Sequence, residues 1–147
     1  MKIFSILMTA FFLTKSCTTV PKAVPQNPVF EYTANTRGFY QNIIIQDKIV
    51  SVSNDQSGET KPETTTLSDE SWQFLLSEYK KVNLDELPNF KAPTEKRKYD
   101  GAAIANFKIT IADKAYQTES FDHGFPPEEI ANLIQKILAF IPQENEN

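Results

Sequence analysis

The residues best suited to chemistry lie near the C-terminal end of the chain, where Asp122 and His123 stand in the segment 121–125 (FDHGF). His123 is the only histidine in the sequence, and an imidazole titrates near neutral pH. Together with Asp122, and with Asp100 if the fold brings it near, His123 could perform acid–base catalysis or hold a metal ion. In the structural alternative, Asp122 or His123 bonds backbone N–H groups near the start of the next helix, while Gly124 adopts an unusual φ. We favour the structural interpretation, because a zinc site needs more ligands than one histidine provides.

Other catalytic patterns do not occur in the sequence. No serine lies in a Gly-x-Ser-x-Gly turn, and the four glycines are scattered singly, so no phosphate-binding loop is expected. The formal net charge is −4, and the one basic cluster, Lys96-Arg97-Lys98, is too short for a nucleic-acid-binding surface. The sequence therefore predicts no catalytic residues, no metal, no cofactor and no nucleic-acid partner, and favours a non-enzymatic protein.

The single cysteine, Cys17, follows a short apolar segment at the N-terminus. Residues 3–13 (IFSILMTAFFL) are apolar and follow Lys2, which fits the hydrophobic part of a signal peptide and is too short to span a bilayer. One cysteine excludes an internal disulfide framework, and an exposed free thiol would be unusual in an exported protein. The alternative is an ordinary secretory signal followed by an incidental cysteine.

A charged start, an apolar run and Ser16 directly before Cys17 resemble a bacterial lipoprotein signal, of the Leu-x-x-Ser-Cys kind seen in the Bacteroidota. Thr14 and Lys15 depart from the standard form of this signal. The resemblance implies cleavage after residue 16, diacylglycerol on the thiol of Cys17, a palmitate-type acyl chain on its new amino group, and attachment to a membrane. It also implies a location in the cell envelope, at the outer membrane facing the periplasm, because no acidic residue follows Cys17 closely.

The domain boundaries follow from composition. Residues 1–16 are predicted to be the signal peptide, and residues 17–28 a lipidated cysteine with a proline-containing tether. Residues 29–142 form one domain, since 40% apolar and 12% aromatic residues in the whole chain argue against disorder. Residues 143–147 are expected to be a flexible tail.

Within the domain we predict the order strand–strand–strand–helix–strand–strand–helix. Alternation of apolar and polar residues, or enrichment in β-branched residues, predicts strands over 29–34, 39–46, 49–53, 103–111 and 115–121. Asp47-Lys48 and residues 112–114 are expected to be turns. The polar segments 54–66 and 89–99 are expected to be loops.

Two segments have the apolar spacing of amphipathic helices. The first opens at Ser68, a good N-cap, and is closed by Leu84, Leu87 and Pro88. The second follows Pro126-Pro127 and ends before Pro142. The fold class is therefore α+β: a single domain with an antiparallel sheet of about five strands and two amphipathic helices on one face.

This order of elements is also similar to that of emfourin-type inhibitors of metalloproteases, with LSDE at the first helix, Leu-Pro after it and Pro-Pro before the last helix. The resemblance implies a protease-inhibitor-like module that uses loops such as 54–66 or 89–99. Three hypotheses follow: an envelope lipoprotein that binds a protein or a small ligand, an inhibitor module, and a small enzyme or metal binder at Asp100, Asp122 and His123.

Overall fold

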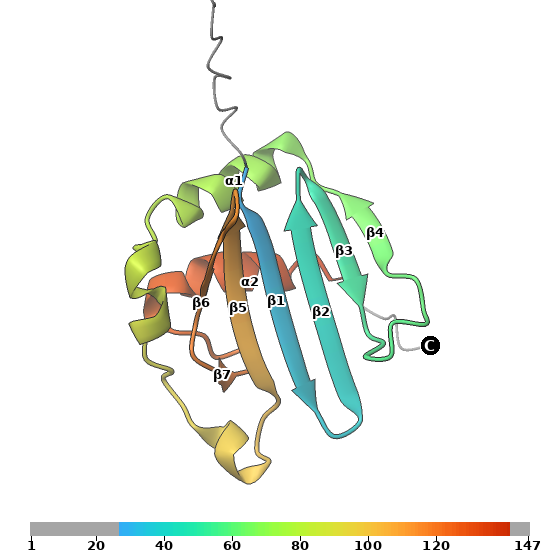
Figure 1. Cartoon of the computed structure of the whole chain (residues 1–147), viewed down its shortest axis with the longest axis vertical. Coiled ribbons are helices and arrows are strands. Elements are labelled where there is room, and N and C mark those ends of the chain that lie inside the picture. Colours follow the sequence, from blue (N-terminus) through green and yellow to red (C-terminus); the bar gives the residue numbers. More distant parts are fainter. Residues whose placement is uncertain (1–26, 142–147) are drawn as a thin grey trace, which may run out of the picture.

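The computed structural model describes residues 27–141, which form one sheet with helices against it (Figure 1). The expected signal peptide, Cys17, most of the tether and the tail lie outside the described residues. The strands are β1 (Val29–Thr36), β2 (Phe39–Gln46), β3 (Ile49–Ser53), β4 (Glu63–Thr66), β5 (Ile104–Ile111), β6 (Lys114–Gln117) and β7 (Phe121–Asp122). The helices are α1 (Asp69–Tyr79), α2 (Ala131–Leu138) and three 3₁₀ segments, η1 (Leu84–Asn89), η2 (Lys96–Tyr99) and η3 (Glu128–Ile130).

The strands pair antiparallel throughout, in the order β4-β3-β2-β1-β5-β6, and β7 also pairs with β5. The predicted α+β class and antiparallel sheet are confirmed, whereas the predicted strand count is too low. The turn at Asp47-Lys48 is confirmed, and both residues have positive φ, as tight hairpin turns require. Ala112 also has positive φ, and Ile111 pairs directly with Lys114.

The predicted loop 54–66 is wrong at its end, because Glu63–Thr66 pairs with β3 as the edge strand β4. All four residues of β4 are exposed, so the strand lacks the apolar alternation that marks a half-buried strand. Its threonines are β-branched, which suits a pleated edge.

The predicted strand 115–121 is divided into β6 and β7 by a β-bulge. Lys108 pairs with Gln117 and Ala105 pairs with Phe121, so two residues of β5 face three residues of the returning chain. In the bulge, the Phe107 N–H donates to Thr118 Oγ1 at 3.1 Å, and the Thr118 N–H donates to the Phe107 carbonyl at 2.9 Å. The threonine side chain therefore replaces a backbone acceptor where the ladder is interrupted.

The helices differ from the prediction in length. α1 begins as expected, with the Ser68 Oγ accepting the N–H of Ser71, but it ends at Tyr79, and the residues predicted to close it form the separate segment η1. The second helix begins as the 3₁₀ turn η3 and continues as the eight-residue α2. Its predicted apolar stripe is buried at Ile130, Leu133, Ile134 and Ile137. None of the helices in residues 27–141 has the length and hydrophobicity needed to span a membrane.

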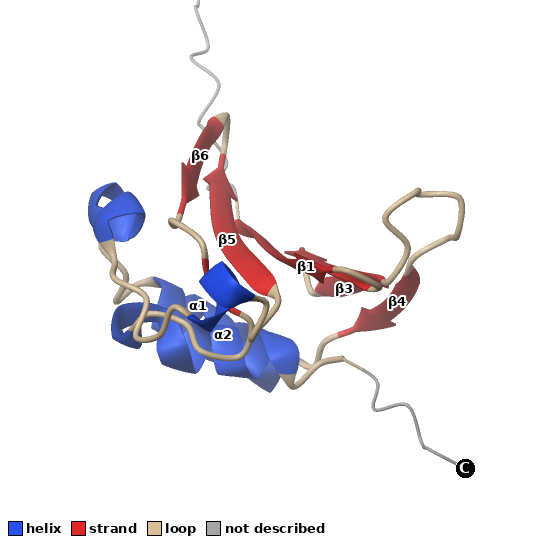
Figure 2. Ribbon diagram, turned by 90° about the horizontal axis from the view of Figure 1, so that it is seen from below, coloured by secondary structure: helices blue, strands red, loops and turns tan. Residues whose placement is uncertain are grey.

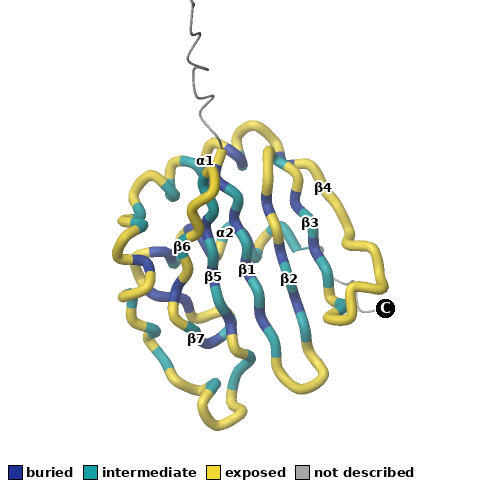
Figure 3. Tube along the Cα trace, viewed as in Figure 1, coloured by how far each residue is buried: buried dark blue, intermediate teal, exposed yellow. Residues whose placement is uncertain are grey.

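Both α-helices lie on the same side of the sheet, and no helix formed by residues 27–141 covers the opposite face (Figure 2). Strands therefore alternate between buried and partly exposed residues along their length (Figure 3). The core at the centre of this layer is aromatic: the ring of Phe30 lies 6.2 Å from that of Trp72, 5.9 Å from that of Tyr79 and 6.4 Å from that of Phe107.

We expect Phe30→Ala to lower the free energy of unfolding by about 3–5 kcal/mol, because the substitution leaves a cavity between β1 and α1. The measurement is urea unfolding followed by circular dichroism. Phe74→Ala is the matched control: Phe74 lies on α1 but is 41% exposed, so its replacement should cost less than about 1 kcal/mol. Equal losses in the two variants would contradict the packing described here.

Candidate functional site

Asp122 lies in β7 with its side chain fully buried, and its carboxylate is surrounded by donors from the segment 94–97. Thr94 Oγ1 donates at 2.5 Å and the backbone N–H of Lys96 at 2.7 Å to Oδ2. The backbone N–H of Arg97 donates at 2.9 Å, and its guanidinium at 3.1 Å, to Oδ1. Asp122 therefore fastens the start of η2 to the sheet.

These hydrogen bonds determine the charge state of Asp122. Burial by itself would raise the pKa of the carboxyl group, but the hydrogen bonds from Thr94, Arg97 and Lys96 outweigh it and hold the pKa well below its usual range. A carboxylate that stays ionised and accepts four hydrogen bonds from the protein is poorly suited to general acid–base catalysis near neutral pH.

His123 is half-buried beside two aromatic residues, on the helix side of the sheet. Its Nδ1 lies 2.8 Å from the Tyr32 hydroxyl oxygen, and its ring centroid lies 5.4 Å from that of Phe39. Burial lowers the pKa of His123 below its usual value. Burial also raises the pKa of Tyr32 to about 12, despite a hydrogen bond from the backbone of Gly124 that acts in the opposite direction. A neutral imidazole that accepts the Tyr32 hydroxyl hydrogen at Nδ1 carries its own proton on Nε2.

The structural interpretation of this corner describes the observed contacts well, with one change. Asp122 does accept backbone N–H groups at the start of a helix, but that helix is η2, which precedes the corner in the sequence. Gly124 has φ +81°, as expected for a glycine in this turn. Asp122 and His123 are neighbours whose side chains have separate partners.

The third residue of the predicted site, Asp100, lies at the C-terminal end of η2, exposed and with φ +58°. In residues 27–141, no three His, Cys, Asp or Glu side chains lie close enough together to hold a metal ion, so Asp100, Asp122 and His123 do not form such a group. Cys17 lies outside the described residues.

The uncovered face of the sheet is the inside of a bend. Strands β5 and β6 rise out of the plane of β1, β3 and β4, the helices lie on the outer side, and the loop between β3 and β4 rises at the other edge (Figure 2). The register places Asn106 (β5), Thr33 (β1) and Asn42 (β2) side by side on this face. We call these three residues the amide row; each is partly exposed.

A shallow hollow of about 200 Å³ lies over two residues of the amide row, Thr33 and Asn106, and over the next row of the sheet. It is lined by Glu31, Thr33, Asn106, Lys108 and Gln117. Glu31 and Lys108 lie directly opposite each other in the register and form an ion pair. The charged groups of the hollow therefore compensate each other, and its other lining side chains are neutral hydrogen-bonding groups.

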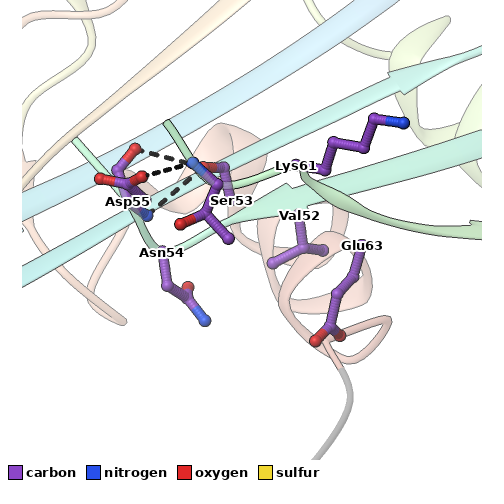
Figure 4. A pocket seen from close by; sticks show the side chains of 7 residues that line it. Val52, Ser53, Asn54, Asp55, Lys61 and Glu63 are labelled. Carbon is purple, nitrogen blue, oxygen red and sulfur yellow. Dashed lines mark hydrogen bonds between the residues drawn. The ribbon is translucent and has the colours of Figure 1, made fainter. Parts of the chain in front are cut away.

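A second hollow, of about 260 Å³, lies where β3 leads into the loop before β4 (Figure 4). It is lined by Val52, Ser53, Asn54, Asp55, Thr60, Lys61 and Glu63. Asp55 orders this loop: its carboxylate accepts the Ser57 N–H at 2.8 Å, the Ser57 hydroxyl at 2.6 Å and the Thr60 N–H at 2.7 Å. These hydrogen bonds, with that of the Ser57 side chain the largest cause, hold the pKa of Asp55 well below its usual range.

The amide row is the part of the candidate site that sequence reasoning missed. Each member is the polar partner in an apolar–polar alternation, and such an alternation indicates only which face of a strand is buried. A site could have been recognised only from the alignment of three such polar residues on adjacent strands, and this alignment is known only once the strand pairing is known.

Comparison of the sequence with protein-family models and with curated proteins finds no match. The function must therefore be argued from the geometry.

We expect Asp122→Asn to lower the free energy of unfolding by about 3 kcal/mol, because it removes the buried partner of the Arg97 guanidinium and weakens three further hydrogen bonds. Urea unfolding at neutral pH measures this. The control is Asp100→Asn, which replaces an exposed residue whose positive φ asparagine tolerates, and which should change the free energy by less than about 0.5 kcal/mol. If Asp122→Asn left the free energy of unfolding unchanged, this would contradict the conclusion that Asp122 holds η2 against the sheet.

Because burial lowers the pKa of His123, we expect the free energy of unfolding to depend on pH. This pKa is lower in the folded protein than in the unfolded chain, where it is about 6.5, so the unfolded chain binds the proton first as pH falls. The contribution of His123 to stability is thus complete well above pH 6.5 and declines as pH falls from there toward the folded-state pKa. Urea unfolding between pH 8 and pH 5, in wild type and in His123→Gln, measures this decline. A decline of the same size in both would contradict the assignment to His123.

Proposed function

We propose that the chain is a lipid-anchored binding module of the bacterial cell envelope, with no catalytic role, and that it binds its partner through the uncovered face of the sheet. The observation that supports this proposal best is that the helices of residues 27–141 cover only one of the two faces of the sheet. Helices pack on one face, while the other face is concave (Figure 2). The concave face presents the amide row and the hollow beside it to the surroundings.

The position of the N-terminus supports an anchored arrangement. β1 begins at Val29, at the end of the sheet where the turns at Asp47-Lys48 and Ala112-Asp113 lie, as the pairing of Val29 with Thr110 requires. A tether that leaves from this end would place a membrane at one end of the strands rather than against the concave face. Lipid on Cys17 and a periplasm-facing outer-membrane location are part of this proposal.

The contacts of Asp122 support a non-enzymatic role. Asp122-His123 is the pair in the sequence best suited to catalysis. The Asp122 carboxylate, however, is buried and accepts four hydrogen bonds from residues 94–97, which it holds against the sheet. Its structural use removes the strongest argument for catalysis at this corner.

A protease-inhibitor-like module is the second candidate. The observation in its favour is the loop from Asn54 to Pro62, which the Asp55 carboxylate orders and which projects beside β4. Inhibitory loops are commonly held rigid before they bind, because this lowers the entropic cost of association. A secreted metalloprotease recovered with the protein from envelope extract would favour this candidate over a ligand at the concave face.

The anchor predicts a defined covalent change. When the full chain is made in a host that processes lipoproteins, its intact mass should correspond to cleavage before Cys17 plus diacylglycerol and an acyl chain, and the protein should float with membranes. Each buried methylene contributes about 0.8 kcal/mol, so two or three acyl chains suffice for stable attachment. Cys17→Ala should abolish both results, and Thr18→Ala, the matched control, should change neither. An unmodified Cys17 in the wild-type protein would contradict the anchor.

A further inference from the structure

We propose that the concave face binds an uncharged carbohydrate chain, which lies across β5, β1 and β2 along the amide row. This inference rests on the proposed function, since it names the chemical class of the ligand for that face. The observation that carries it is the juxtaposition of Asn106, Thr33 and Asn42 on three adjacent strands beside the 200 Å³ hollow.

The spacing of the amide row suits a repeating polymer of sugars. Adjacent strands lie about 4.8 Å apart, so the row presents one hydrogen-bonding side chain at about every 4.8 Å over a span of about 10 Å. This spacing is close to the rise of one residue in an extended β-linked sugar chain. Asparagine side chains and the threonine hydroxyl all donate and accept hydrogen bonds, as sugar hydroxyl groups do.

The side chains of the amide row are not engaged elsewhere in the described part of the chain. No hydrogen bond among residues 27–141 involves the side chains of Thr33, Asn42 or Asn106, whereas the neighbouring Ser53 hydroxyl is bonded to the backbone of Asp55. The sheet holds the three residues in register, which reduces the entropy lost when a ligand binds.

The charges of the face favour an uncharged ligand. Glu31 and Lys108 pair with each other at the centre of the face, so neither a cation nor an anion finds an uncompensated partner in the hollow. The whole chain is acidic, with 19 acidic against 15 basic residues, which disfavours an anionic polymer such as nucleic acid.

The composition of the face disfavours a protein partner at this place. The buried centre of a protein interface is rich in aromatic and apolar side chains. The amide row is polar, and the exposed isoleucines of the concave face, Ile44 at 36%, Ile49 at 51% and Ile104 at 41% exposure, stand in three other rows of the sheet and form no apolar centre. An extended peptide would pair instead with an open sheet edge such as β4.

The experiment is isothermal titration calorimetry of the full chain, kept soluble in lauryldimethylamine oxide, because a sugar-based detergent would compete. The probes are chitotetraose and cellotetraose, which are β-linked, with maltotetraose as an α-linked comparison and tetragalacturonate as an anionic comparison. We expect at least one β-linked tetrasaccharide to bind, and the double variant Asn42→Ala/Asn106→Ala to bind it about tenfold more weakly, from the loss of two neutral hydrogen bonds. Gln73→Ala, on the exposed side of α1, is the control and should bind like wild type.

A second measurement does not depend on any variant. In nuclear magnetic resonance spectra of the wild-type protein, the side-chain NH₂ signals of Asn42 and Asn106 should shift when the tetrasaccharide that binds in the calorimetric titration is added. The inference is overturned if neither β-linked tetrasaccharide binds at millimolar concentration, if only maltotetraose or tetragalacturonate binds, if the double variant binds as tightly as wild type, or if the shifts fall outside the concave face.

The outcome is separable from that of the proposed function. An anchored protein that binds no neutral sugar overturns the carbohydrate inference and leaves a protein partner for the module. Sugar binding by a chain whose Cys17 is unmodified sustains the inference and overturns the anchor.

Discussion

Strand β1 lies in the middle of the sheet, and the alternation of its side chains determines how both faces of the domain are used. Phe30, Tyr32 and Ala34 are completely buried against the helical layer, while Glu31 and Thr33 point to the opposite face. Because side chains alternate with a period of two, a shift of one residue in register would exchange the two sets. The aromatic cluster around Phe30 therefore holds in place the polar face from which we argue function.

Away from this centre, the irregular parts of the chain are held by single polar side chains rather than by apolar packing. The buried carboxylate of Asp122 fixes η2, Thr118 completes the ladder at the bulge, and Asp55 orders the loop between β3 and β4. All three satisfy backbone N–H groups that have no partner in a helix or strand. The polar residues that stand out in the sequence thus act mainly within the protein, and the concave face is the surface for which we propose an interaction.

Local signals were sufficient for much of the fold. The ends of β2 and β3 agree with the prediction, because Asp47-Lys48 favours a tight turn and both flanking segments are rich in β-branched residues. The N-cap at Ser68 also depends only on residues close in sequence. By contrast, β4 is an exposed edge strand without apolar alternation, and only its pairing with β3 identifies it. The partners of Asp122 lie 25 to 28 residues away, and the amide row joins three strands, so neither could be found without the register.

The most direct test of the account is the reactivity of a thiol on the concave face in native envelopes. If Cys17 carries lipid, Ser51→Cys on the concave face and Gln73→Cys on the helical face each introduce the one free thiol of the protein. We predict that a maleimide labels the thiol at position 51 more slowly in envelopes than in the purified protein, because a ligand covers it there, while the thiol at position 73 is labelled equally in both. Equal labelling of position 51 in the two preparations, or slower labelling only at position 73, would contradict the claim that this protein binds through the uncovered face of its sheet.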